Sequence, residues 1–124
     1  MSAVWTDSRA ISVNVGGGTA VRIVEESFPR EAVAGQWQGF RVVARVVSGR
    51  CIPAVGMQYV DGSADYMEVE VGGAVYRLER GGLPKAWTDN VERSGGEEIV
   101  FEARVRFPID GSYTVKLLAG YVSR

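Results

Sequence analysis

The residues that could carry out chemistry in this chain are carboxylates, arginines and one cysteine, because the sequence contains no histidine. Without imidazole, Ser-His-Asp and Cys-His nucleophile sites, imidazole proton shuttles and the common zinc spheres are excluded. The single cysteine, Cys51, has no partner for an internal disulfide, and we interpret it as a small buried hydrophobic residue rather than a reactive thiol. The lack of a disulfide favours an intracellular or virion context.

Two pairs of carboxylates could serve a glycosidase, in which two acids flank the scissile bond. They are Asp61 with Asp65, and Glu68 with Glu70. We interpret them as solvated turn and strand residues, and a carboxylate enzyme such as a glycosidase is kept as the second alternative function. The segment 61–65 also lacks the ligand count of a calcium loop. We therefore expect no catalytic residue, no metal site and no cofactor.

The elements that must position these side chains are β-strands. At 124 residues the chain is long enough for one domain with its own core, and we expect a single domain over 1–124 with a loosely ordered terminus at 1–9. Valine-rich runs of period 2, separated by glycines, predict an all-β fold of about seven to eight antiparallel strands. The predicted strands are Ala10–Val15, Thr19–Val24, Gln36–Val47, Ile52–Val60, Tyr66–Val71, Ala74–Leu78, Glu97–Phe107 and Ser112–Val122.

One hairpin is specified in register by its turn. The two-residue loop Gly72-Gly73 joins Tyr66–Val71 to Ala74–Leu78, so Val71 should face Ala74 across the ladder. The same register places apolar pairs on one face and brings Glu68 opposite Arg77 on the other.

The segment 81–96 interrupts this pattern. It is bracketed by glycine pairs, and Trp87 and Val91 have helical spacing, which suggests a helical turn or two in a long loop between Leu83 and Arg93. Trp87 is a candidate interface anchor there. The alternative is that its ring packs back over the end of the domain.

The turn and strand at Phe107–Val115 carry a resemblance to a known architecture. Tyr113 follows Gly111 by two residues, which is similar to the tyrosine corner at strand F of immunoglobulin-like domains. Ala34–Ala44 looks like the turn and strand B of the same domains. Over 34–122 the chain therefore resembles an immunoglobulin-like or fibronectin-type-III-like antiparallel β-sandwich of prokaryotic or viral type, without the core cysteines of antibody domains.

That resemblance implies a possible basic face. Strands B and E are antiparallel neighbours in such sandwiches, which would bring four arginines together on one outer surface. Arginine forks bind phosphate, so this surface is a candidate polyanion face. The competing interpretation, which we favour, is that Glu102 and other acids neutralise the arginines while their stems cover Val43 and Val47. The four arginines are Arg41, Arg45, Arg104 and Arg106.

The resemblance also leaves one edge strand unaccounted for. If Ser112–Val122 is strand F, no strand G follows it. Either an N-terminal strand such as Ala10–Val15 covers this edge, or the last strand is itself G, or a partner supplies a strand. Leu118 and Tyr121 on this strand are candidate interface residues, with a homodimer or higher oligomer expected through this strand or the Trp87 loop.

Charge and composition narrow the function only broadly. Fourteen basic against 15 acidic residues produce no field that would attract nucleic acid to the whole molecule. No signal peptide or membrane span is recognisable, which predicts a cytoplasmic or virion-associated protein, and the scarcity of amide side chains is typical of a thermophile or a GC-rich source. We expect a non-catalytic interaction or structural module in an assembly such as a virion or surface layer, with a protein partner or self-association. Nucleic-acid or polyanion binding is the alternative.

Overall fold

The structure is a computed structural model that describes residues 2–8 and 20–123. The described residues form strands and turns without a helix, so no described segment could cross a membrane as an apolar helix. The predicted strand Ala10–Val15 lies outside the described residues. The strands are β1 (Ser2–Ser8), β2 (Ala20–Glu26), β3 (Gln38–Ser48), β4 (Arg50–Cys51), β5 (Pro53–Gly62), β6 (Tyr66–Val71), β7 (Ala74–Glu79), β8 (Lys85–Trp87), β9 (Arg93–Ser94), β10 (Glu98–Arg106) and β11 (Tyr113–Ser123).

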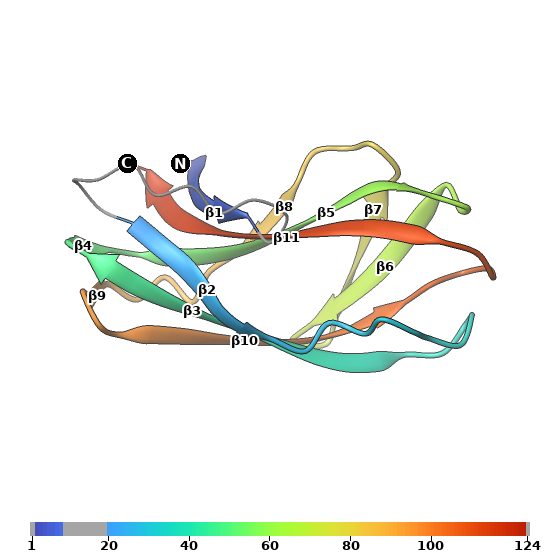
Figure 1. Ribbon diagram of the computed structural model, residues 1–124, viewed down its shortest axis with the longest axis horizontal. Coiled ribbons are helices and arrows are strands. Elements are labelled where there is room, and N and C mark those ends of the chain that lie inside the picture. The colour runs from blue at the N-terminus through green and yellow to red at the C-terminus, as the bar shows by residue number, and fades with distance from the viewer. Residues whose placement is uncertain (1, 9–19, 124) are drawn as a thin grey trace.

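Two antiparallel sheets pack face to face (Figure 1). The four-stranded sheet has the order β1-β11-β5-β8, and the five-stranded sheet has the order β2-β3-β10-β6-β7. A small ribbon of β4 and β9 closes one end. The prediction of an all-β antiparallel sandwich is thus confirmed.

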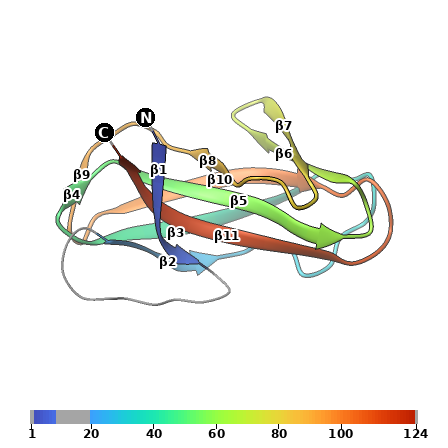
Figure 2. The same ribbon diagram turned by 90° about the horizontal axis from the view of Figure 1, so that it is seen from above.

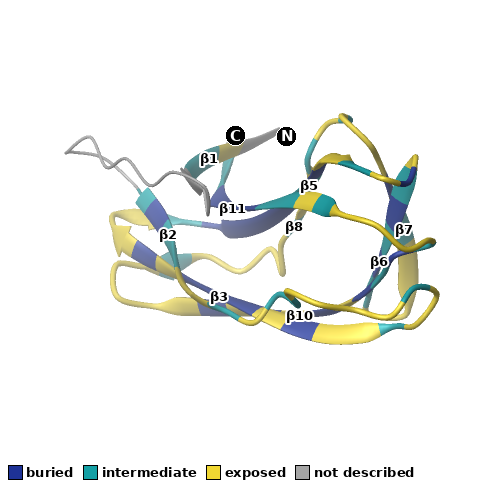
Figure 3. Cartoon of the chain, turned by 45° about the vertical axis from the view of Figure 1, so that its right-hand side comes forward, coloured by how far each residue is buried: buried dark blue, intermediate teal, exposed yellow. Residues whose placement is uncertain are grey.

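The core lies between the sheets because alternate residues of each strand point inward. In β10, burial alternates from residue to residue, and β3 contributes Val42 and Ala44, both fully buried. Figure 3 shows the buried stretches of β3, β10 and β11 in dark blue. The buried core includes Val42, Ala44, Phe101, Val105 and Leu117, and Tyr113 and Val115 are partly buried against it.

The hairpin β6–β7 has the predicted register. Val71 lies opposite Ala74, and Glu68 lies opposite Arg77. However, Glu68 and Arg77 do not form an ion pair with each other. Arg77 bonds to Glu79 on its own strand, whereas Glu68 accepts a hydrogen bond from Arg106 of β10 on its other side.

The expected helical turn between Leu83 and Arg93 is wrong. This segment, predicted as part of a long loop at 81–96, instead contains β8, which pairs with β5, and β9, which pairs with β4. A helix of one or two turns is only marginally stable by itself. The extended conformation brings Trp87 against the ring of Phe101, with centroids 5.3 Å apart, and this tertiary contact outweighs the weak helical spacing.

The N-terminal residues expected to be loosely ordered form strand β1. It runs antiparallel to β11, with Ser2 opposite Ser123 and Ser8 opposite Leu118 (Figure 2). Of the three alternatives for the edge of the last strand, an N-terminal strand covers it from Leu118 to Ser123, and that strand is Ser2–Ser8.

Two glycines make this pairing possible. A Cβ atom on Gly120 would lie 1.8 Å from the carbonyl oxygen of Val4, so β1 approaches β11 at a distance that only glycine permits. The ring of Trp5 crosses β11 to reach Gly56 of β5, where an added Cβ would lie 2.5 Å from the indole. Thr6 completes the attachment, because its hydroxyl accepts a hydrogen bond from the Val21 amide at 2.7 Å.

Candidate functional site

The four predicted arginines lie on the outer face of the five-stranded sheet, where three of them form ion pairs. Arg104 bonds to Glu70, and Arg106 pairs with Glu68 at 2.8 Å. Arg45 pairs with Glu98 at 2.6 Å. The outer face of the sheet therefore carries paired positive and negative charges rather than a uniformly basic surface.

Arg41 is the exception within the described residues, where its guanidinium forms no ion pair. Glu102 is the residue directly opposite Arg41 in the register of the β3–β10 ladder. On the same face, Val43 between Arg41 and Arg45 is buried, whereas Val47 is 47% exposed, so the expected cover by arginine stems is wrong for Val47.

Trp37 adds an aromatic surface beside two of these arginines. The Arg106 guanidinium lies 4.4 Å from the ring centroid of Trp37, and that of Arg104 lies 5.5 Å from it. The bond from Arg104 lowers the pKa of Glu70 below its ordinary value. Both interactions hold the arginines in place and leave them less available to an external phosphate.

The predicted interface residues are placed differently from one another. Trp87 packs inward against Phe101 and Tyr76, so it is a core-edge residue and not an exposed anchor. Leu118 is only 6% exposed. Tyr121 is half-buried and lies opposite Val4 of β1. The edge formed by Leu118 and Tyr121 is thus already paired.

Three of the carboxylates considered for chemistry have arginine partners. Asp65 lies 3.4 Å from Arg80, while Glu68 and Glu70 are bonded to arginines. Within the described residues no histidine, cysteine, aspartate and glutamate side chains cluster as metal ligands would. Cys51 is half-buried, and burial together with the nearby Glu92 raises the pKa of its thiol, which makes it a weaker nucleophile.

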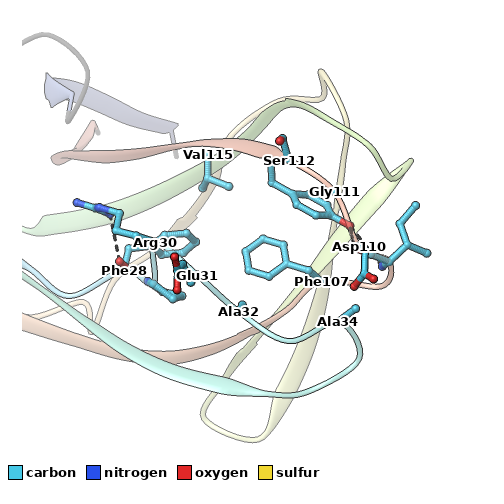
Figure 4. Close-up of a pocket in the computed structure, with 13 residues that line it drawn as sticks. Phe28, Arg30, Glu31, Ala32, Ala34, Phe107, Asp110, Gly111, Ser112 and Val115 are labelled. Atoms are coloured by element: carbon cyan, nitrogen blue, oxygen red, sulfur yellow. Dashed lines mark hydrogen bonds between the residues drawn. The ribbon is translucent and has the colours of Figure 1, made fainter.

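A groove that the sequence analysis did not identify opens on one side of the sandwich. It has a volume of about 550 Å³ and lies between the segment after β2 and the first half of β11 (Figure 4). Its apolar surface is aromatic. The ring centroid of Phe107 lies 4.6 Å from that of Tyr113, in a tilted arrangement, and 6.4 Å from that of Phe28, in an edge-to-face arrangement. Val115 of β11 lines the same groove.

Short hydrogen bonds hold both walls of the groove. On one side, the amide of Gly35 donates to the carbonyl oxygen of Phe107 at 2.8 Å. On the other side, the Tyr113 hydroxyl donates to the carbonyl oxygen of Ile109 at 2.5 Å, which is the geometry expected of a tyrosine corner. The groove is therefore a preformed feature of the turn at 107–112 and not a gap between loosely placed loops.

The charged residues at the groove are not equivalent. The guanidinium of Arg30 already donates hydrogen bonds to the carboxylate of Glu26 and to the carbonyl oxygen of Phe28. Glu31 and Asp110 are exposed and form no ion pair with any residue in the ranges 2–8 and 20–123. In Figure 4 the Phe107 ring lies between Glu31 and Asp110. The unpaired carboxylates of Glu31 and Asp110 thus lie on either side of the aromatic surface of the groove.

Among the described residues, no strand pairs with the edge of β11 that lies above the groove. β1 pairs with β11 only from Leu118 to Ser123, so the stretch Tyr113–Leu117 has no strand on that edge among the described residues. The Val122 amide donates to Ile52 at 2.9 Å on the β5 side. Since successive residues of a strand direct their backbone groups to opposite edges, those of Tyr113 and Val115 face the open side.

Sequence patterns identified only part of this site. The sequence pattern around Tyr113 predicts the turn, but it does not predict that Phe28 and Pro29 lie beside that turn. The two walls of the groove come from residues 28–34 and 107–115, which are far apart in the sequence. No local sequence pattern predicts that they meet, because their proximity depends on how the sheets pack. A loop phenylalanine followed by proline was the one available signal.

Comparison of the chain with protein families, with curated proteins and with solved structures found no match to any of them.

Proposed function

We propose that this protein is a non-catalytic interaction module of the immunoglobulin-like type that binds an extended polypeptide segment along the open edge of β11. The strand orders support the architectural part of the proposal. β2-β3-β10-β6 corresponds to the order A-B-E-D of such domains, and β11-β5 corresponds to F-C. β1 then stands in the place of strand G.

The observation that carries the proposal is that, among the described residues, strand pairing covers this edge of β11 only from Leu118 to Ser123. The uncovered stretch Tyr113–Leu117 spans about 13 Å from first to last Cα, which matches a short extended peptide. An added strand would satisfy backbone groups that face solvent, and its inward side chains would enter the groove beside Val115. Backbone bonds would supply affinity, and the groove would supply selectivity.

The edge strand β7 of the five-stranded sheet is less suited to this role. β7 borders the five-stranded sheet, and its residues Arg77 and Glu79 carry charges that discourage pairing. No residue of β7 lines the groove, so a strand added to β7 would not place its side chains in it.

The polyanion alternative has weaker support. Binding phosphate at Arg45, Arg104 or Arg106 would require breaking ion pairs that are already formed. Weak retention of the wild-type protein on heparin at low salt is therefore the expected result.

A peptide library displayed on phage tests the proposal. Selection against the wild-type protein should yield peptides whose binding is lost in Val115→Lys, because the lysine stem would occupy the groove. Val100→Lys is the matched control, since Val100 is 50% exposed on the outer face of the other sheet. Hydrogen exchange should show that bound peptide protects the amides of Tyr113 and Val115.

Two results would refute the proposal. One is selected peptides that bind wild type and Val115→Lys equally well. The other is protection confined to β7 or to the arginine face, which would move the binding surface to the other sheet.

A further inference from the structure

From the charges around the groove we infer that the bound segment has apolar residues at alternate positions, flanked by basic residues. This inference rests on the proposed function and specifies the chemistry of its partner. It does not follow from strand addition alone, which is indifferent to side-chain charge.

The alternation follows from the depth of the groove. A strand beside Tyr113–Leu117 directs every second side chain between the sheets, onto the rings of Phe28 and Phe107. The remaining side chains point to solvent. A volume of about 550 Å³ lies within the range of pockets that enclose small ligands, so it can accept more than one apolar side chain.

The basic flanks follow from Glu31 and Asp110. Both carboxylates are exposed at the groove and unpaired within the described chain, while Arg30, the one cation lining it, is already bonded to Glu26. Opposite charges at an interface rim accelerate association and select against partners of the wrong sign. A peptide with acidic ends would meet two like charges there.

The continuity of the edge supports a strand as the occupant. β1 already pairs antiparallel along the same edge of β11, ending where Ser8 lies opposite Leu118. A bound segment would extend the four-stranded sheet from that point toward Tyr113, in line with β1, and would close the open side of the sandwich.

Two synthetic peptides test the inference by fluorescence polarisation. The first is Lys-Val-Ser-Val-Ser-Val-Lys, and the second has glutamate in place of both lysines. We expect the lysine peptide to bind about tenfold more tightly at low salt, with the difference shrinking as salt is raised. The lysine peptide with proline in place of its central valine is the control for backbone pairing and should not bind.

The double variant Glu31→Lys with Asp110→Lys should reverse the preference between the two peptides. Glu102→Lys, on the outer face of β10, adds the same kind of charge change away from the groove and should leave the preference intact.

The outcomes separate this inference from the function on which it rests. If both peptides bind equally and Val115→Lys weakens both, the charge preference is overturned and the strand-addition function stands. If neither peptide binds, or if Val115→Lys changes nothing, both are overturned.

Discussion

Replacing Gly120 with alanine should release β1 from the edge of β11. The new Cβ would lie 1.8 Å from the carbonyl oxygen of Val4 and 2.7 Å from the Cα of Trp5. Both are backbone atoms, so no side-chain rotation relieves the overlap. Strand β1 must move by roughly 1.5 Å to restore ordinary contact, and a shift of that size breaks backbone hydrogen bonds, which require about 3 Å between donor and acceptor.

The cost can be worked out from what the shift disrupts. Loss of about two backbone bonds costs ~1–3 kcal/mol. Lifting the Trp5 ring partly off Gly56 exposes on the order of 80 Å² of apolar surface, or ~2 kcal/mol. We therefore expect Gly120→Ala to lower the free energy of unfolding by about 3–5 kcal/mol, with complete release of β1 as the upper limit.

Urea unfolding followed by circular dichroism measures this loss, and hydrogen exchange at Val4 and Trp5 locates it. Gly39→Ala is the matched control, because Gly39 also lies in a strand and its added Cβ would meet nothing closer than the Ala103 carbonyl oxygen at 4.0 Å. The control should stay within about 0.5 kcal/mol of wild type. A Gly120→Ala protein that is as stable as the control and keeps its β1 amides protected would refute the packing of β1 described above.

Three further predictions concern the core, the turn and the charged face. Phe101→Ala should cost about 3–5 kcal/mol in chemical unfolding, since Phe101 is 8% exposed and packs between two aromatic rings; a loss below about 1 kcal/mol would contradict its inward placement. Tyr113→Phe should cost about 1 kcal/mol through the lost hydrogen bond to Ile109, and an unchanged melting temperature would show that the bond contributes nothing. Arg104 lowers the pKa of Glu70 in the folded state, so the stabilisation from this carboxylate is present above its ordinary pKa, near 4, and is lost as the pH falls through the lower folded value. The wild-type protein should therefore lose more stability on acidification than Glu70→Gln. Melting temperatures of the two proteins that fall in parallel with pH would argue against the pairing.

The sequence by itself determined the features that depend on neighbouring residues. The strands β3, β5, β6, β7, β10 and β11 follow from period-2 alternation and glycine punctuation, and the register of the β6–β7 hairpin follows from its two-residue turn. Tyr113 is recognisable for the same reason, since its hydroxyl bonds to a backbone group only four residues upstream. Each of these choices is made within a window of about ten residues.

The tertiary structure alone decided which residues meet across the sandwich. Glu68 could pair with Arg77 or Arg106, and the choice depends on the neighbouring strand that lies beside β6. Trp87 leaves its weak helical pattern because the Phe101 ring offers a larger buried contact. Neither outcome is encoded near the residue concerned.

The N-terminal strand shows the same limit most clearly. Nothing in Ser2–Ser8 indicates that this segment would pair with the last strand. The residues that let it approach closely are Gly56 and Gly120, which lie far along the chain. The extent of that pairing also sets where the open edge begins, and the packing of the sheets brings Phe28 beside Phe107 beneath it. The groove and its edge therefore exist only once the two sheets have packed, since each wall comes from a segment that has no reason by itself to lie near the other.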